Sequence, residues 1–296
     1  DWVYPTNVMA DPDLIYLDHN ATTPLAPEAW EAMRPFLTEN WANPSSGYRF
    51  ARRAREAVQL ARSQVAALIG AEADEIVFTS GGTESSHVAI HSAIALHPER
   101  RHLVTCATEH DATLRPYDEF AAQGYDVSIL PVDAEGRIDM AAYEAVLRPG
   151  QTALVSLMWA NNETGLIHPI DQAAAMAHER GILFHTDAVQ AAGKVAIDFS
   201  QSRVHYASLS GHKLHGPKGV GVLYVKNTAR FRPSQLGGGQ ARIDQPGAVE
   251  QLLHVRALVG VVLVLDLADD LFDEVLDGQK RKRIVGEILY DIYDDF

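Results

Sequence analysis

The chain has 296 residues, of which 47% are hydrophobic and 22% are charged, as is typical of a folded globular protein with a large core. This composition excludes a mostly disordered or collagen-like chain. There are 25 Lys and Arg residues against 39 Asp and Glu residues, so the formal net charge is −14. An acidic surface repels phosphate backbones and anionic lipids, so we expect neither a nucleic-acid nor a membrane partner.

Cysteine content and apolar runs bear on the expected location. Cys106 is the single cysteine, so no intrachain disulfide can form. The longest apolar run, residues 257–265, is too short to span a bilayer. Residues 1–5 have neither the basic start nor the apolar stretch of a secretory signal. We therefore expect a cytoplasmic protein.

In chain order, the first predicted element is a strand over 16–24 that runs into a turn, with Pro24 and Pro27 as breakers. Residues 52–69 follow as an amphipathic helix, because their apolar side chains repeat at helical spacing.

The middle of the chain alternates short apolar runs with longer helical patterns. Such runs are typical of strands buried on both faces of a largely parallel sheet. The predicted strands are 75–79, 103–107, 126–130, 153–158, 181–185, 206–209 and 220–225, and the predicted helices among them are 83–96 and 171–180. The sequence therefore predicts an α/β fold, with a seven-stranded sheet between helices.

The last part of the chain has a different pattern. Residues 237–240 are a glycine-rich hinge or loop, and residues 252–296 have a helical pattern with a basic cluster at 280–283. Acids on either side of that cluster favour a solvated helix face over a nucleic-acid site.

Polar and small residues follow the predicted strands, and ligands bind at the carboxyl ends of strands in doubly wound sheets. Glycines and a threonine open the helix after the first strand, where backbone N–H groups bind anions. In chain order the candidate site residues are Gly82, Thr83, His110, Asn162, Asp187, Gln190, Ser210, His212 and Lys213.

This set of side chains suits pyridoxal 5′-phosphate. The cofactor needs a lysine for its aldehyde, a carboxylate for its pyridinium nitrogen, and donors for its phosphate and ring oxygen. Each residue taken alone has a plainer structural explanation, since a Gly-Gly-Thr turn also caps helices and Asn is common in turns. The combination favours the cofactor.

Three motifs resemble one known family in their order and spacing. They are Asp-His-Asn-Ala-Thr-Thr-Pro at 18–24, Asn-Asn-Glu-Thr-Gly at 161–165, and Ser-Gly-His-Lys followed by Gly-Pro-Lys-Gly at 210–219. Residues 16–240 thereby resemble the fold-type I, class V aminotransferase group, and within it the cysteine desulfurases of the NifS/IscS type. The resemblance implies conversion of L-cysteine to L-alanine with sulfur transfer to a thiol acceptor, a sulfur-acceptor protein partner, a homodimer and a part in iron–sulfur cluster assembly.

The resemblance also implies roles for three candidate catalytic and cofactor-binding residues. Lys213 would form the Schiff base with the cofactor. Asp187 would pair with the pyridine nitrogen. His110 would stack on the ring and move protons.

The remaining candidates would hold the cofactor's oxygen atoms. Gln190 would hydrogen-bond the ring oxygen, and Asn162 would lie near the same atom. The resemblance places four residues around the phosphate: Gly82, Thr83, Ser210 and His212.

The C-terminal part departs from the family pattern. Gln245 stands at the family's arginine position and Ala248 at its threonine position, and Cys106 lies in a predicted strand rather than on a mobile loop. We therefore predict an incomplete or divergent small domain. The predicted divisions are an N-terminal segment that joins the small domain, a large cofactor-binding domain, and a linking helix with a divergent end: 1–30, 31–240 and 241–296.

Two other functions stay open: a class V aminotransferase or β-lyase that needs no catalytic cysteine, and a catalytically impaired protein that keeps the fold. We expect no metal site, because we expect no H-x-x-x-H pair beside an acid on one helix face and a single cysteine gives no thiolate cluster.

Overall fold

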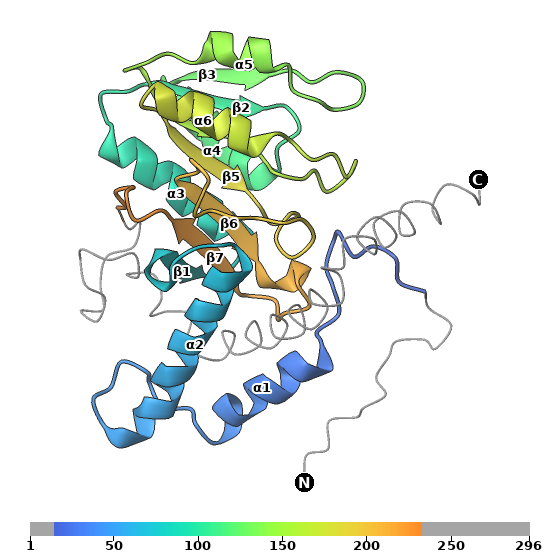
Figure 1. Cartoon of the computed structure of the whole chain (residues 1–296), viewed down its shortest axis with the longest axis vertical. Helices are drawn as coiled ribbons and strands as arrows, with labels where there is room; N and C mark the ends of the chain where they lie inside the picture. The colour runs from blue at the N-terminus through green and yellow to red at the C-terminus, as the bar shows by residue number, and fades with distance from the viewer. Residues whose placement is uncertain (1–14, 233–296) are drawn as a thin grey trace.

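The computed structural model describes residues 15–232, which form one seven-stranded sheet with helices against both faces (Figure 1). The strand order is β1-β7-β6-β5-β4-β2-β3. Strands β2 to β6 pair in parallel, and β7 pairs antiparallel with both β1 and β6. The strands are β1 (Ile76–Thr79), β2 (His102–Cys106), β3 (Asp126–Leu130), β4 (Thr152–Ser156), β5 (Leu183–Asp187), β6 (Tyr206–Ser210) and β7 (Gly221–Val225). The predicted α/β class and mostly parallel seven-stranded sheet are confirmed.

Two hydrophobic clusters hold the helices to the sheet. One cluster joins one face to α3 and α4, and the other joins the opposite face to α2, α5 and α6. Burying one large apolar side chain such as Phe184, which is fully inaccessible, contributes about 1.5–3 kcal/mol. The helices are α1 (Pro27–Thr38), α2 (Arg52–Leu68), α3 (Gly82–Leu96), α4 (Asp111–Ala122), α5 (Met140–Val146) and α6 (Ile170–Glu179), with short 3₁₀ turns η1 (Arg49–Ala51), η2 (Ala73–Glu75) and η3 (Gly211–Lys213).

The structure corrects two of the predicted elements. The strand predicted over 16–24 is wrong, because this segment is irregular and carries a turn. It hydrogen-bonds to the 3₁₀ turn η3 instead of a strand, through Thr23 N–H and the carbonyl of His212 at 2.9 Å. Strand β3 is not buried on both faces, because it lies at the sheet edge and leaves Ile129 51% exposed.

Three helices were not predicted, and each lacks a strong sequence signal. Helices α1 and α4 carry internal prolines, Pro35 and Pro116, and α5 has only seven residues. The predicted elements 237–240 and 252–296 lie outside the described residues. The division of the chain near residues 30 and 240 stays a prediction. Within 15–232, the helices are too short or too polar to cross a membrane.

Candidate functional site

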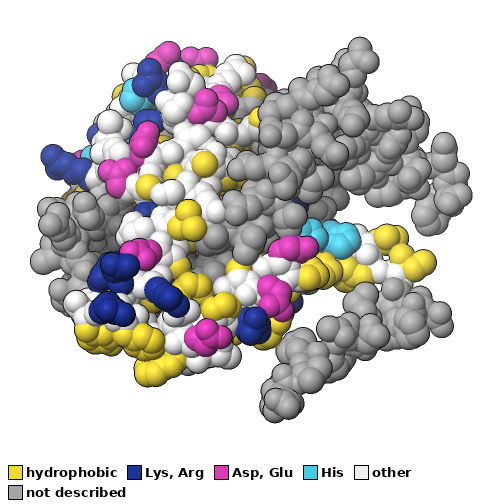
Figure 2. All heavy atoms as spheres, turned by 60° about the horizontal axis from the view of Figure 1, so that its bottom comes forward, with side chains coloured by type: hydrophobic (Ala, Val, Ile, Leu, Met, Phe, Trp, Pro, Cys, Tyr) yellow, Lys and Arg dark blue, Asp and Glu magenta, His cyan; other side chains and the backbone are white. Residues whose placement is uncertain are grey.

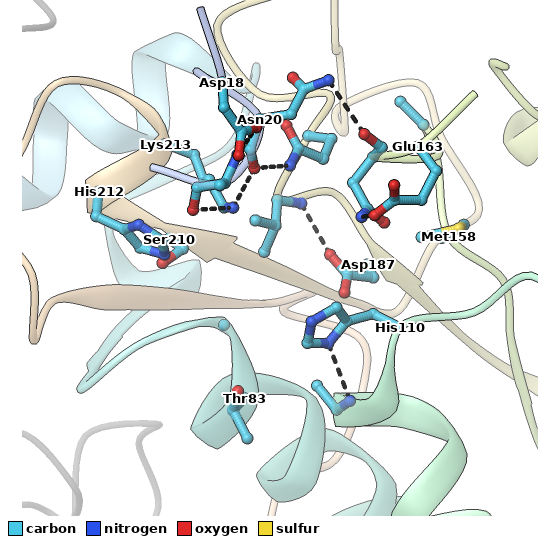
Figure 3. Close-up of a pocket in the computed structure, with 17 residues that line it drawn as sticks. Asp18, Asn20, Thr83, His110, Met158, Glu163, Asp187, Ser210, His212 and Lys213 are labelled. Atoms are coloured by element: carbon cyan, nitrogen blue, oxygen red, sulfur yellow. Dashed lines mark hydrogen bonds between the residues drawn. The ribbon is translucent and has the colours of Figure 1, made fainter. Parts of the chain in front are cut away.

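A cavity of about 450 Å³ lies at the carboxyl ends of the parallel strands (Figure 3). Its wall contains all nine residues that the sequence singled out, although they come from five separate segments of the chain. Eight further residues line it: Asp18, Asn20, Ala21, Ala112, Met158, Ala160, Glu163 and Val189. The cavity therefore brings the predicted cationic, acidic and amide groups together.

Lys213 ends the 3₁₀ turn η3 directly after β6. Its Nζ donates hydrogen bonds to the carbonyl oxygens of Asn20 and Ala21, the latter at 2.7 Å. Burial lowers the pKa of Lys213, and the nearby carboxylates of Asp18 and Asp187 oppose that shift. A lowered pKa increases the fraction of neutral amine, which is the form that attacks a carbonyl carbon.

Asp187 is the last residue of β5 and is 7% exposed. Its Oδ1 accepts a hydrogen bond from the N–H of Val189 at 2.9 Å. Desolvation raises the pKa of Asp187, while that hydrogen bond and the charges of His110 and Lys213 lower it. A carboxylate held in this way is suited to pairing with a protonated ring nitrogen.

His110 caps the N-terminus of α4 with its ring. The Nδ1 atom accepts a hydrogen bond from the N–H of Ala112 at 3.0 Å. In the neutral ring the proton is therefore on Nε2, because an acceptor nitrogen carries no hydrogen. The cap fixes the ring orientation at the cavity wall (Figure 3).

The N-terminus of α3 borders the cavity. No side chain among the described residues caps this end, so first-turn N–H groups at Gly82 and Thr83 face the cavity without such a partner. A Cβ on Gly82 would lie 2.7 Å from the Cγ2 of Val189, so a side chain cannot fit there without displacing Val189. Ser210 and His212 line the same cavity, with His212 Nδ1 3.0 Å from Thr22 Oγ1.

The two amide residues already have protein partners. Gln190 donates from Nε2 to the carbonyl of Asn20 at 2.8 Å and accepts at Oε1 from Lys194 at 2.6 Å. Asn162 donates to the carboxylate of Glu163. Both side chains line the cavity, and their roles toward a ring oxygen stay predictions.

The structure adds one residue pair that the sequence reasoning missed. His87 and His91 form an H-x-x-x-H pair on α3, with ring centroids 3.9 Å apart, and the carboxylate of Glu119 acts on His91. An H-x-x-x-H pair is thus present, contrary to the expectation, but the acid that acts on it lies on α4 and not on the same helix face. The described residues nevertheless contain no group of three His, Cys, Asp or Glu side chains that could hold a metal ion.

Asp18, Asn20 and Ala21 were not singled out as site residues, although the motif at 18–24 contains them. The motif itself indicated them. They were passed over because the site residues were sought directly after predicted strands, and this segment precedes the first strand. Glu109 was also missed, because an acid before a histidine has no pattern of its own. It is buried behind the cavity, with Oε1 accepting from the N–H of Met158.

A family profile described as Aminotransferase class-V matches residues 15–266. The chain is 50% identical over 289 residues to a cysteine desulfurase of Cereibacter sphaeroides, covering 93% of this chain and 73% of the relative. It is 52% identical over 240 residues to cysteine desulfurase NifS of Azotobacter vinelandii, covering 81% of this chain and 59% of the relative.

A solved structure, SspA in complex with cysteine, is similar with a TM-score of 0.78 and 35% identity, covering 86% of this chain and 72% of that one. The chain spans about three fifths of the length of most of the curated relatives that it matches, for instance 58% and 61%.

Proposed function

Because the chain belongs to the class-V aminotransferase family, we propose that it acts as a cysteine desulfurase that uses pyridoxal 5′-phosphate. The observation that carries the proposal is the convergence of Lys213, Asp187 and His110 on one cavity. Relatives of about 50% identity are named cysteine desulfurase, and the related SspA was solved with cysteine. In the proposed reaction L-cysteine and a thiol give L-alanine and a persulfide.

The residues present fit the cofactor. The open end of α3 suits a phosphate group, and glycine at 82 avoids a Cβ that would lie 2.7 Å from Val189 Cγ2. The buried carboxylate of Asp187 suits a pyridinium nitrogen. Lys213 supplies the amine. Bound in this way, the cofactor would supply an electron sink for a carbanion at the Cα atom of the substrate.

The chain's own residues would orient and exchange protons. Asp187 would hold the proton of the ring nitrogen at its carboxylate. Lys213 would exchange its bonds to the carbonyls of Asn20 and Ala21 for a bond to the cofactor. His110 would present Nε2–H toward the cavity as a proton donor, since Nδ1 holds the N–H of Ala112.

The sulfur acceptor in this proposal is a thiol of another molecule. Cys106, the chain's single cysteine, is buried in β2, and burial raises the pKa of its thiol. A thiol that is both enclosed and protonated is a poor nucleophile. Sulfur would therefore pass from the substrate to the acceptor, whose S–H becomes S–SH as alanine leaves.

The burial of Cys106 also favours a second candidate, a β-lyase or aminotransferase that needs no catalytic cysteine. Product analysis distinguishes the reactions. Purified protein with pyridoxal 5′-phosphate, L-cysteine and an added thiol should release alanine and persulfide in equal amounts. Pyruvate without alanine would overturn the desulfurase and support the lyase. Absence of both products, with the cofactor bound, would support the impaired protein.

A homodimer, a sulfur-acceptor protein, a part in iron–sulfur cluster assembly and a cytoplasmic location complete the proposal, and the family resemblance supports them. Exposed apolar side chains favour an interface in the part of the chain around α1 and α2. Trp41 is 67% exposed and makes a T-shaped contact with Phe50, and Tyr48 is 55% exposed. Figure 2 shows apolar side chains gathered beside basic ones on one face. Sedimentation equilibrium tests the dimer.

A further inference from the structure

Glu109 lies in the loop between β2 and α4, directly before His110. It connects this loop to the segment that follows β4. Its side chain is 7% exposed and does not line the cavity. The Oε1 atom accepts a hydrogen bond from the N–H of Met158, which follows β4. Asn161 Nδ2 donates to the carbonyl of Thr108 at 3.1 Å. These two bonds hold the β2–α4 loop against the segment after β4. Because His110 belongs to this loop, they also set its position.

The second carboxyl oxygen of Glu109 has a different environment. Oε2 is buried, and neither it nor Thr113 Oγ1 makes a well-formed hydrogen bond among residues 15–232, although the Thr113 side chain lies close enough to lower the pKa of Glu109. The titratable group that acts on Glu109 is Asp187 on β5, whose negative charge raises the pKa of Glu109. Glu109 in turn raises the pKa values of Tyr117 on α4 and Cys106 on β2. The ring of His110 is directed to the cavity instead.

Two neighbouring buried carboxyl groups do not both ionise readily. Asp187 has the better support for a negative charge, because Val189 donates to it and His110 and Lys213 act on it. Glu109 has the N–H of Met158 and the side chain of Thr113, but desolvation together with Asp187 outweighs them and raises its pKa well above the usual range. This asymmetry favours the charge on Asp187 and the proton on Glu109.

We propose that Glu109 is a positioning residue that works as a neutral carboxylic acid: Oε1 holds the His110 loop against β4, and the proton on Oε2 removes a charge that would otherwise face Asp187. The inference rests on the proposed function in one respect, that Asp187 serves the cofactor. The neutral form matters because a second anion would make Asp187 more basic and less able to remain a carboxylate.

Infrared difference spectroscopy on the cofactor-free full chain tests the protonation directly. Subtracting the spectrum of Glu109→Gln from that of the parent at neutral pH should reveal the C=O stretch of one protonated carboxyl group. The matched control Glu56→Gln, an exposed acid on α2 paired with Arg52, should remove carboxylate bands alone. Loss of carboxylate bands in Glu109→Gln would overturn the proposal. A Glu109→Gln protein that fails to fold would do so too, because the amide is a neutral isostere.

Cofactor affinity tests the positioning role. Glu109→Gln should bind pyridoxal 5′-phosphate within about 2-fold of the parent, since its amide oxygen still accepts from Met158. Glu109→Leu leaves the N–H of Met158 buried without an acceptor. The dissociation constant of this variant for pyridoxal 5′-phosphate should rise about 10-fold. Equal affinities for parent and Glu109→Leu would refute the positioning role. A parent that does not bind the cofactor would refute the proposed function, while the infrared result would still decide the state of Glu109.

Discussion

Lowering the pH is predicted to destabilise the protein through His185, which lies in a buried chain of hydrogen bonds across the sheet. Tyr117 donates to Ser156 Oγ at 2.9 Å, and that oxygen is 3.1 Å from His185 Nδ1. His185 Nε2 is 2.9 Å from Ser208 Oγ, which accepts from Ser86 at 3.0 Å. The imidazole is fully inaccessible, and burial lowers its pKa to about 3.

The size and sign of the effect follow from proton binding. In the unfolded chain the histidine pKa is about 6.5, so below that pH the unfolded state binds more protons than the folded state. The stability from neutral His185 is complete above pH of about 6.5 and is lost as the pH falls toward the folded pKa. At about 1.4 kcal/mol per pH unit, lowering the pH from about 6.5 to about 5 costs about 2 kcal/mol of unfolding free energy.

Urea unfolding of the parent and of His185→Gln at about pH 7.5 and about pH 5 measures this loss. The parent should lose about 2 kcal/mol more than the variant over this interval. Glu109 and Asp187 act in the opposite direction, because their raised pKa values mean that the folded state binds the extra protons there, and the comparison of parent with variant cancels them. Equal losses in the parent and His185→Gln would refute the reasoning.

Three further substitutions test the site. Gly221→Ala places a Cβ 2.5 Å from the backbone of Gly81, so it should cost about 1–3 kcal/mol in urea unfolding and weaken cofactor binding; an unchanged midpoint would contradict the close approach. Asp187→Asn should retain cofactor in equilibrium dialysis but lower turnover of cysteine by about 100-fold, and turnover within a few-fold of the parent would contradict its role. Cys106→Ala should lose about 1 kcal/mol of stability yet keep its turnover, because the acceptor thiol lies elsewhere; complete loss of turnover in a folded variant would contradict that account.

The strands were predictable because each buried strand is a short apolar run bounded by turns or helical patterns. Phe184 and its neighbours in β5 give such a run, and the ends of β5 and β6 then place Asp187 and Lys213 at one edge. The segment 16–24 misled because its apolar Tyr16 and Leu17 suggest a strand, whereas its hydrogen bonds go to the lysine turn. That pairing joins residues about 190 positions apart, and local sequence cannot reveal it.

The cavity's chemistry was predictable in type and incomplete in detail. A lysine, a carboxylate and a glycine-rich helix start are recognisable from residue type alone. The Nδ1 cap of His110 and the buried carboxyl of Glu109 are not, because both depend on which backbone N–H groups the folded chain brings near. Sequence indicates which groups are available, and packing decides which of them are charged.

Borohydride reduction followed by peptide mapping tests the central claim most directly. The full chain is incubated with pyridoxal 5′-phosphate, reduced and digested, beside the matched variants Lys213→Ala and Lys218→Ala. The account predicts one cofactor group per chain, attached to the peptide that contains Lys213, retained in Lys218→Ala and absent from Lys213→Ala. Cofactor attached elsewhere, or equal labelling of Lys213→Ala and the parent, would contradict it.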